Sequence, residues 1–332
     1  MNTVPSEDSS KQPQDLQDFY VKLNTAKKEI GKVIFGQNTV IDRTLIGLMA
    51  GGHMLLVGVP GLAKTLMVET ISTVFGLSTN RIQCTPDLMP ADILGSEVLD
   101  DDDKGKRTFR FIPGPIFSQF LMVDEINRTS PRTQSALLQA MQEKFVTVAG
   151  ATHDLPNPFH VLATQNPIEQ EGTYPLPEAQ LDRFLMQVDV DYPTREEERN
   201  VLLVSTSNDN QKAEAVLKSE DLLAIQHFVR DMPIGESVVD AILNLVRNGR
   251  PGDDAPTIVN EYVTWAPGPR AAQALMLTSR AKALMESRPS PSIDDVKALA
   301  EPVLKHRMNL SYKASANGVT IQDVIESLTS DL

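Results

Sequence analysis

Short apolar runs that end in polar residues alternate with helical patterns through the first half of the chain. Three such runs predict strands, at 54–57, 120–123 and 159–164, and the strand-like segment at 81–84 supplies another. One helical face follows the first run, with apolar positions at Val68, Ile71 and Phe75. Because strands that alternate with helices form parallel sheets, we predict an α/β domain whose sheet is covered by helices.

The pattern changes at about 191–195, where we place a domain boundary. Four helices are predicted beyond it, at 219–232, 236–248, 269–286 and 292–308. Ser292 and Asp295 have the spacing of a capping box at the start of the last one. No strand is predicted there before the final residues. The chain therefore divides into an α/β domain at 18–191 and an all-helical domain at 192–332, after a polar, disordered tail at 1–17.

A second local pattern lies between the third and fourth predicted strands. Ser130 followed by Pro131 is typical of a helix start. Downstream, 145–152 combines alternating polarity with a turn glycine, which predicts a β-hairpin within 144–158.

Composition limits the function classes. The 332 residues carry 44 acidic against 31 basic side chains, a net charge of −13, which disfavours binding to nucleic acid and favours protein partners. No apolar run is long enough for a membrane span, and the N-terminal residues do not resemble a secretory signal, so a cytoplasmic protein is expected. The single cysteine, Cys84, is expected to be a buried structural thiol.

A glycine-containing loop follows the first predicted strand and precedes a helix. Glycines let backbone N–H groups turn toward phosphate oxygens, and the helix that opens at Lys64 points its positive end at them. Lys64 would contact the β and γ phosphates of a nucleoside triphosphate, and the Thr65 hydroxyl would ligate Mg²⁺. Ala63 replaces the usual glycine and is expected to avoid a positive φ. The predicted nucleotide-binding residues here are Gly58, Val59, Pro60, Gly61, Leu62, Ala63, Lys64, Thr65 and Leu66.

Paired carboxylates end the third predicted strand. Asp124 is placed to hold Mg²⁺, and Glu125 to polarise the water that attacks the γ phosphate. Two acids at a strand end could instead cap a helix in a solvated turn, but the phosphate loop upstream favours the first interpretation.

The chain resembles the MoxR family of AAA+ ATPases from about residue 34 through the helical half. Five ordered motifs carry the resemblance: GVPGLAKT at 58–65, VDEINR at 123–128, ATQNP at 163–167, EAQLDRF at 178–184 and PGPRA at 267–271. The family implies an AAA+ P-loop NTPase fold: a parallel five-stranded sheet with flanking helices, followed by a C-terminal all-helical lid.

The resemblance also implies roles for single residues. Asn166 would be the first sensor of the γ phosphate, although Asn-Pro can simply start a turn. Arg183 would be an arginine finger given to the adjacent subunit, unless it only pairs with Asp182. Arg270 would be the second sensor at the start of a lid helix, unless it is a solvated cation. Adenine is expected against a separate group, Val33, Ile34, Gly36 and Gln37.

Family membership further implies two mechanical inserts, one within the second helix at 88–115 and the pre-sensor hairpin at 144–158. The expected function is that of a ring-forming, chaperone-like ATPase motor, hexameric, which remodels partner proteins or assists metal cofactor insertion. Partners with a von Willebrand factor A domain are implied in the same way. A magnesium-chelatase motor subunit, a DNA-translocating helicase relative and a nucleotide-gated scaffold are alternatives.

Overall fold

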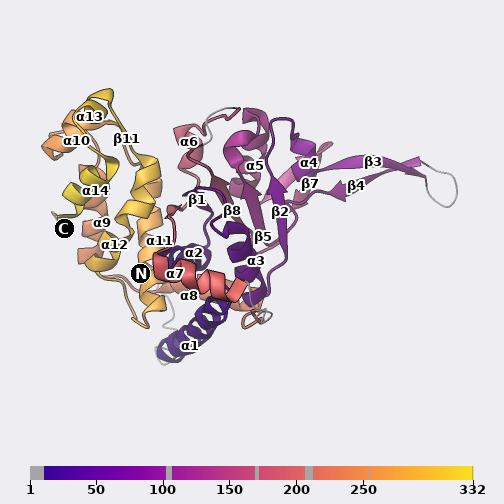
Figure 1. The fold of residues 1–332 in the computed structure, drawn as a ribbon, viewed down its shortest axis with the longest axis horizontal. Coiled ribbons are helices and arrows are strands. Elements are labelled where there is room, and N and C mark those ends of the chain that lie inside the picture. The colour runs from indigo at the N-terminus through magenta and orange to yellow at the C-terminus, as the bar shows by residue number, and fades with distance from the viewer. Residues whose placement is uncertain (1–10, 102–106, 169–171, 206–211, 254, 331) are drawn as a thin grey trace, which may run out of the picture.

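The computed structural model describes residues 11–101, 107–168, 172–205, 212–253, 255–330 and 332. Its first half is built on a five-stranded parallel sheet, and its second half is mainly helical (Figure 1). The predicted fold class is therefore confirmed.

The five strands lie in the order β2-β5-β8-β1-β9, and each neighbouring pair is parallel. Four of them match the predicted strands: β1 (Met54–Gly58), β2 (Thr79–Gln83), β5 (Phe120–Asp124) and β8 (His160–Gln165). The fifth, β9 (Met186–Val190), is an edge strand in which half-buried Gln187 and Asp189 alternate with buried residues. Because polar residues interrupt the apolar ones in β9, the sequence pattern predicted no strand at 186–190.

Successive residues of the central strands enter two different cores, because side chains alternate across a sheet. In β1, Met54 and Leu56 pack in one core, and Leu55 packs in the other. The first core also holds residues of α1 (Lys11–Gly31), α2 (Asn38–Met49) and α3 (Lys64–Val74). The second holds residues of α4 (Pro90–Leu94) and α5 (Pro131–Glu143). The domain thus has helices on both faces of the sheet.

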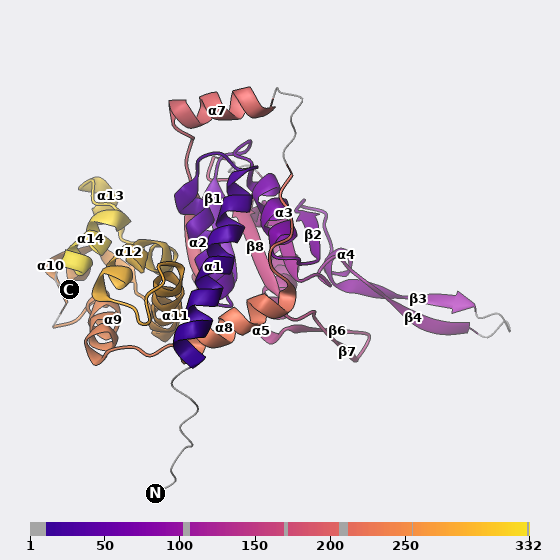
Figure 2. The ribbon, with the colours of Figure 1, turned by 90° about the horizontal axis from the view of Figure 1, so that it is seen from below.

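Two hairpins extend from the sheet domain on the same side (Figure 2). The longer one, within 88–115, pairs β3 (Gly95–Asp101) with β4 (Arg107–Pro113) as a projecting arm. The shorter one is the hairpin predicted at 145–152, and pairs β6 (Phe145–Val148) with β7 (Ala151–Asp154). Phe111 of the arm stacks on His153 of β7 with ring centroids 3.9 Å apart, so the two hairpins are in contact.

The second half contains the four predicted helices as α8 (Ser219–Asp231), α9 (Glu236–Asn248), α11 (Pro269–Met285) and α12 (Ile293–Leu304). The pattern did not single out α7 (Arg195–Ser205), α10 (Thr257–Tyr262), α13 (Tyr312–Ala316) or α14 (Ile321–Ser330), nor the short helix α6 (Glu178–Leu181) that precedes β9. Short 3-10 segments are present at η1 (Ile126–Arg128) and η2 (Lys305–Arg307).

Two predictions about this organisation were wrong in part. The second half is not all-helical, because β10 (Val263–Trp265) pairs with β11 (Asn309–Leu310); such short strands leave no periodic signal. The predicted tail at 1–17 is too long, because residues 11–17 are the first turns of α1, whereas 1–10 lie outside the described residues. Partly buried Leu16 and Phe19 pack against the core from this helix, so its apolar stripe extends into the supposed tail.

Candidate active site

The chain turns sharply between β1 and α3. Gly61 has a φ of +86° and Ala63 a φ of +53°, so the expectation that Ala63 avoids a positive φ was wrong. Left-handed residues in such a loop rotate backbone N–H groups to one side, where they form a concavity for an anion. Ala63 is also the N-cap of α3 and makes no side-chain capping bond, which leaves the first N–H groups of the helix to an external acceptor.

Lys64 lies at the start of α3. Its Nζ donates to the Gly58 carbonyl oxygen at 2.6 Å, so the ammonium is folded back over the loop. Burial lowers the pKa of Lys64, and the charges of Asp124 and Glu125 oppose that effect. A phosphate group at the loop would favour the charged ammonium in the same way.

The phosphate loop borders a cavity of about 500 Å³ at the carboxyl ends of the strands. Its other walls are lined by Asp124 and Glu125 from the end of β5, Thr164 and Asn166 from the end of β8, and Arg81 and Gln83 from β2. Open α/β sheets place their ligands at this edge. The structure therefore brings together the phosphate loop, the paired acids and the predicted first sensor.

Asp124 is nearly buried, with 7% of its surface exposed. Its Oδ1 accepts a hydrogen bond from Thr164 Oγ1 at 2.9 Å, and its Oδ2 accepts two from Arg81, from Nε at 2.9 Å and Nη2 at 2.5 Å. Mg²⁺ prefers oxygen ligands, and the Thr65 hydroxyl and this carboxylate both border the cavity. The donor set therefore fits the metal.

Glu125 follows with a φ of +55°, which turns its side chain from the strand direction into the cavity. Positive φ is uncommon for a residue with a side chain and is found preferentially at functional sites. Its Oε2 accepts from Gln83 Nε2 and from Arg128 Nη1, both at 3.0 Å, and its backbone N–H donates to Thr164 Oγ1 at 2.9 Å. Thr164 is therefore hydrogen-bonded to both acidic residues, Asp124 and Glu125.

The geometry of Asn166 is compatible with both interpretations from the sequence, a turn at Asn-Pro and a sensor of the γ phosphate. Its Oδ1 accepts from the Ile168 N–H at 3.1 Å, which is the expected turn at Asn-Pro. Because the oxygen is used in the turn, the amide NH₂ group is the donor that remains for the cavity that Asn166 borders.

Arg183 and Arg270 lie elsewhere. Both border a second cavity, of about 290 Å³, together with His53 and Leu185. The Leu185 N–H donates to the His53 carbonyl oxygen at 2.7 Å, just before the paired starts of β9 and β1. This cavity is thus at the amino ends of the strands, and β1 alone spans roughly 16 Å between the two edges. Neither arginine borders the first cavity.

The sequence left open an ion pair between Arg183 and Asp182, but Asp182 pairs with other arginines. Asp182 accepts from Arg307 at 2.8 Å and lies 3.8 Å from Arg270, whereas Arg183 Nη1 donates to the Leu138 carbonyl oxygen at 2.7 Å. Arg270 is 44% exposed in its side chain, so it is partly solvated as well as paired.

Of the four residues predicted to contact adenine, Gln37 is hydrogen-bonded to the phosphate loop. Gln37 Nε2 donates to the Leu62 carbonyl oxygen at 3.4 Å, which joins the 33–37 segment to the phosphate loop. Gly36 has a φ of +70°, and a Cβ there would meet the Glu197 carboxyl group of α7. Ile34 is buried in the first core and Val33 packs against it, so their side chains serve packing.

Sequence reasoning missed four residues that shape these two edges: Arg81, Gln83, Thr164 and Arg307. The alternation of polar Arg81 and Gln83 around buried Ile82 was a detectable signal, because it puts both side chains on one face of β2. Cys84, as expected, is fully buried, and burial raises the pKa of its thiol to about 12. Across the described ranges, no helix combines the length and apolarity that crossing a bilayer requires.

Comparison with known proteins agrees with this geometry. Residues 53–186 match the family model for the ATPase family associated with various cellular activities (AAA), and residues 255–328 match the AAA lid domain. Chaperone MoxR1 of Mycobacterium tuberculosis is 40% identical over 304 residues, covering 91% of this chain and 80% of that protein. Protein MoxR of Methylorubrum extorquens is 30% identical over 301 residues, covering 86% of each.

A solved structure has the same fold over nearly the whole chain. The crystal structure of a candidate ATPase from Cytophaga hutchinsonii superposes with a TM-score of 0.89 at 40% identity and covers 96% of both chains. Together with the sheet order, the two cavities and the helical half, these similarities show that the chain belongs to the MoxR family of AAA+ ATPases.

Proposed function

We propose that this protein hydrolyses ATP with Mg²⁺ in a ring of identical subunits, hexameric by analogy with its family, and uses the energy to remodel a partner protein. One observation carries the proposal. The phosphate loop, Asp124, Glu125 and Asn166 share one edge of the sheet, whereas Arg183 and Arg270 share the opposite edge.

Within one subunit, each residue of the first cavity has a chemical task. Lys64 and the N–H groups at the start of α3 hold the phosphates, and Thr65 with Asp124 would hold the metal. Bound Mg²⁺ supplies neutralisation of charge on the phosphate oxygens. Glu125 orients and polarises the attacking water, and the Asn166 amide donates to the γ phosphate or to that water.

The arginines fit a task in the neighbouring subunit. An arginine at the amino ends of the strands is separated from its own phosphate loop by the length of β1, which is greater than its side chain. In a head-to-tail ring, the amino edge of one subunit can face the carboxyl edge of the next. Arg183 and Arg270 would then complete the adjacent site, where an arginine finger contributes on the order of 10³-fold or more in rate.

Mixing two inactive variants tests this arrangement. Lys64→Ala removes the phosphate contact and Arg183→Ala removes the finger, so each protein alone should be inactive. In an equal mixture about a quarter of the interfaces combine an intact loop with an intact finger, so about a quarter of the ATPase activity should return if sites act independently.

The matched control mixes Lys64→Ala with a variant that lacks both residues, because this mixture contains no intact loop and should stay inactive. If the first mixture is equally inactive although both variants assemble with each other, the shared site is refuted.

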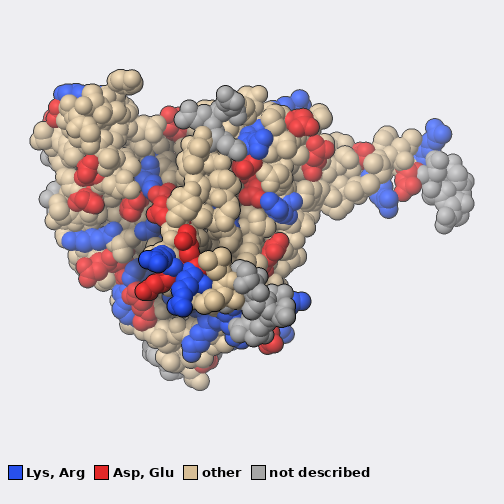
Figure 3. Space-filling model, viewed as in Figure 1, with Lys and Arg blue, Asp and Glu red and all other residues tan. Residues whose placement is uncertain are grey.

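The chaperone-like role is supported by the similarity to Chaperone MoxR1 and by the two hairpins that project from the sheet domain. Clients containing a von Willebrand factor A domain, or undergoing metal cofactor insertion, remain a proposal from the family. Figure 3 shows acidic and basic side chains interspersed on one face of the molecule, without a continuous basic band, in keeping with protein rather than nucleic-acid clients.

A Glu125→Gln variant provides the test for a client. It should bind ATP without hydrolysing it and retain a partner that the Lys64→Ala variant, which lacks the phosphate contact, does not retain. Equal recovery of the same proteins by both variants would contradict nucleotide-dependent client binding.

A further inference from the structure

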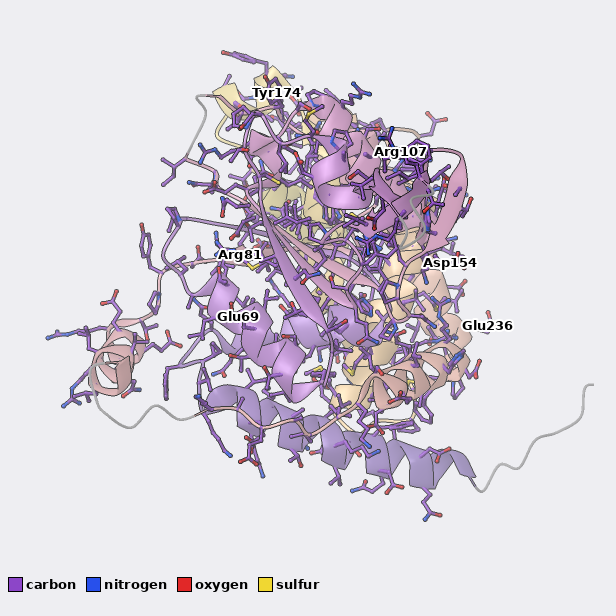
Figure 4. All side chains as sticks on the ribbon, turned by 90° about the vertical axis from the view of Figure 1, so that its right-hand side faces the viewer. Glu69, Arg81, Arg107, Asp154, Tyr174 and Glu236 are labelled. Carbon is purple, nitrogen blue, oxygen red and sulfur yellow. The ribbon has the colours of Figure 1, made fainter. Side chains whose placement is uncertain are left out.

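Arg81 contacts the metal-binding acid from a strand that the known motifs do not include. It lies on β2, the edge strand, where it pairs in register with Met122 of β5 while its guanidinium reaches forward to Asp124. Half of its side chain is exposed, and Arg81 is labelled in Figure 4.

The acceptor positions of Asp124 are nearly all used. A carboxylate has two oxygens with about four acceptor positions in total. Arg81 takes two of them on Oδ2, through Nε and Nη2, and Thr164 takes one on Oδ1. A cation or its water shell that approaches Asp124 therefore meets an oxygen already bound to a guanidinium.

We propose that Arg81 competes with Mg²⁺ for Asp124, so that metal loading requires Arg81 to leave the carboxylate. Arg81 thereby sets how much Mg²⁺ the site needs. This inference rests on the proposed function, because it assumes that the first cavity holds a Mg²⁺–nucleotide complex.

Two observations favour competition over a supporting role. Thr164, only 1% exposed, already fixes Asp124 through Oδ1, so Arg81 is not needed to orient the carboxylate. Arg81 is on an edge strand with half of its side chain in solvent, so it can move into water at little cost. Its second contact, from Nη2 to Gln83 Oε1 at 3.1 Å, is also exposed and gives a position to which it can retreat.

The size of the effect follows from what an arginine does to a neighbouring carboxylate. A guanidinium beside an aspartate weakens proton binding by about 10- to 1000-fold, and a competing dication meets the same repulsion. Because Arg81 is half exposed and screened, we take the lower end, a change of about tenfold.

The experiment measures binding of a fluorescent, non-hydrolysable ATP analogue while free Mg²⁺ is raised from zero in EDTA to millimolar. Arg81→Gln should reach half-saturation at about tenfold lower Mg²⁺ than the unaltered protein. Arg81→Lys, which keeps the charge but not the two-pronged contact, should fall between them. Arg110→Gln is the matched control, because Arg110 also pairs with an aspartate, Asp100, at 3.1 Å, but on the exposed arm.

An unchanged or raised Mg²⁺ requirement in Arg81→Gln would overturn the inference, and a raised one would show that Arg81 supports metal binding. Metal-free analogue binding verifies that the variant is folded; if it is not, the Arg81→Lys midpoint decides in the same way. Absence of Mg²⁺-dependent binding by the unaltered protein would instead refute the proposed function.

Discussion

Replacing Arg307 with methionine is predicted to loosen the segment that carries Arg183, the proposed arginine finger. Arg307 lies in η2 and is 2% exposed. Its guanidinium donates to Asp182 Oδ1 at 2.8 Å and to the carbonyl oxygens of Asp182, Phe184 and Leu185 at 3.2, 2.5 and 3.1 Å. One buried side chain thus holds both ends of the short segment that contains Arg183.

The expected loss in the free energy of unfolding depends on the partners of Arg307 that would lose their donor. Removing one member of a buried ion pair costs about 3–5 kcal/mol, because the other charge and the carbonyls lose their donors. Asp182 is 21% exposed in its side chain and retains Arg270 at 3.8 Å, so we expect the lower end, about 3 kcal/mol. The matched control is Arg43→Met, whose 3.9 Å pair with Glu301 is partly exposed and should contribute less than about 1 kcal/mol.

Urea unfolding followed by tryptophan fluorescence measures this directly. The only tryptophan, Trp265, pairs across β10 and β11 with Asn309, close in the chain to Arg307. ATPase activity should fall while nucleotide binding at the opposite edge is retained. A loss of free energy of unfolding no larger than that of the control would refute this account of Arg307.

Three further predictions concern buried and strained groups. Burial lowers the pKa of His53 to about 3 and of His160 to about 4, so unfolding takes up protons below the unfolded pKa of about 6.5. The free energy of unfolding in urea should be constant above that pH and then fall by about 1.4 kcal/mol per pH unit for each histidine; a flat profile down to pH 5 would contradict this. Burial alone would raise the pKa of Asp295, but Arg288 and neighbouring donors lower it to about 2. Asp295→Asn should therefore cost about 2 kcal/mol at neutral pH, and the difference should vanish as pH falls from 4 toward 2. Ala63→Gly should keep nucleotide affinity and change stability by less than about 1 kcal/mol, because relief of positive φ offsets the greater freedom of glycine when unfolded; a clear loss of affinity would show that the methyl group is needed.

The sequence predicted those helices and strands whose hydrophobic pattern is visible within the element itself. Buried strands such as β5 and β8 are continuous apolar runs, and long helices such as α9 repeat apolar positions over several turns. The edge strand β9, in which half-buried polar residues interrupt the apolar ones, and the short ribbon of β10 and β11 were missed because they leave little periodic signal.

The same distinction applies to the site. The phosphate loop and the pair Asp124 and Glu125 are contiguous in sequence, so their chemistry could be predicted from residue type and order. The contact of Arg81 with Asp124 depends on the register of two strands more than forty residues apart, and the meeting of Arg270 with Asp182 depends on how α11 packs. No periodicity in either segment encodes those partners.

The two edges of the sheet use the same acid–arginine contact with different burial, and this difference suggests a division of labour. At the carboxyl edge, Asp124 is held by Arg81, which is half exposed and can exchange with a metal. At the amino edge, Asp182 is held by Arg307, which is 2% exposed and cannot leave without losing its carbonyl partners. An edge that must accept and release a ligand needs replaceable contacts, whereas an edge that completes a neighbour's site needs fixed ones. We therefore expect nucleotide turnover to rearrange the carboxyl edge of each subunit while its amino edge moves as a rigid unit.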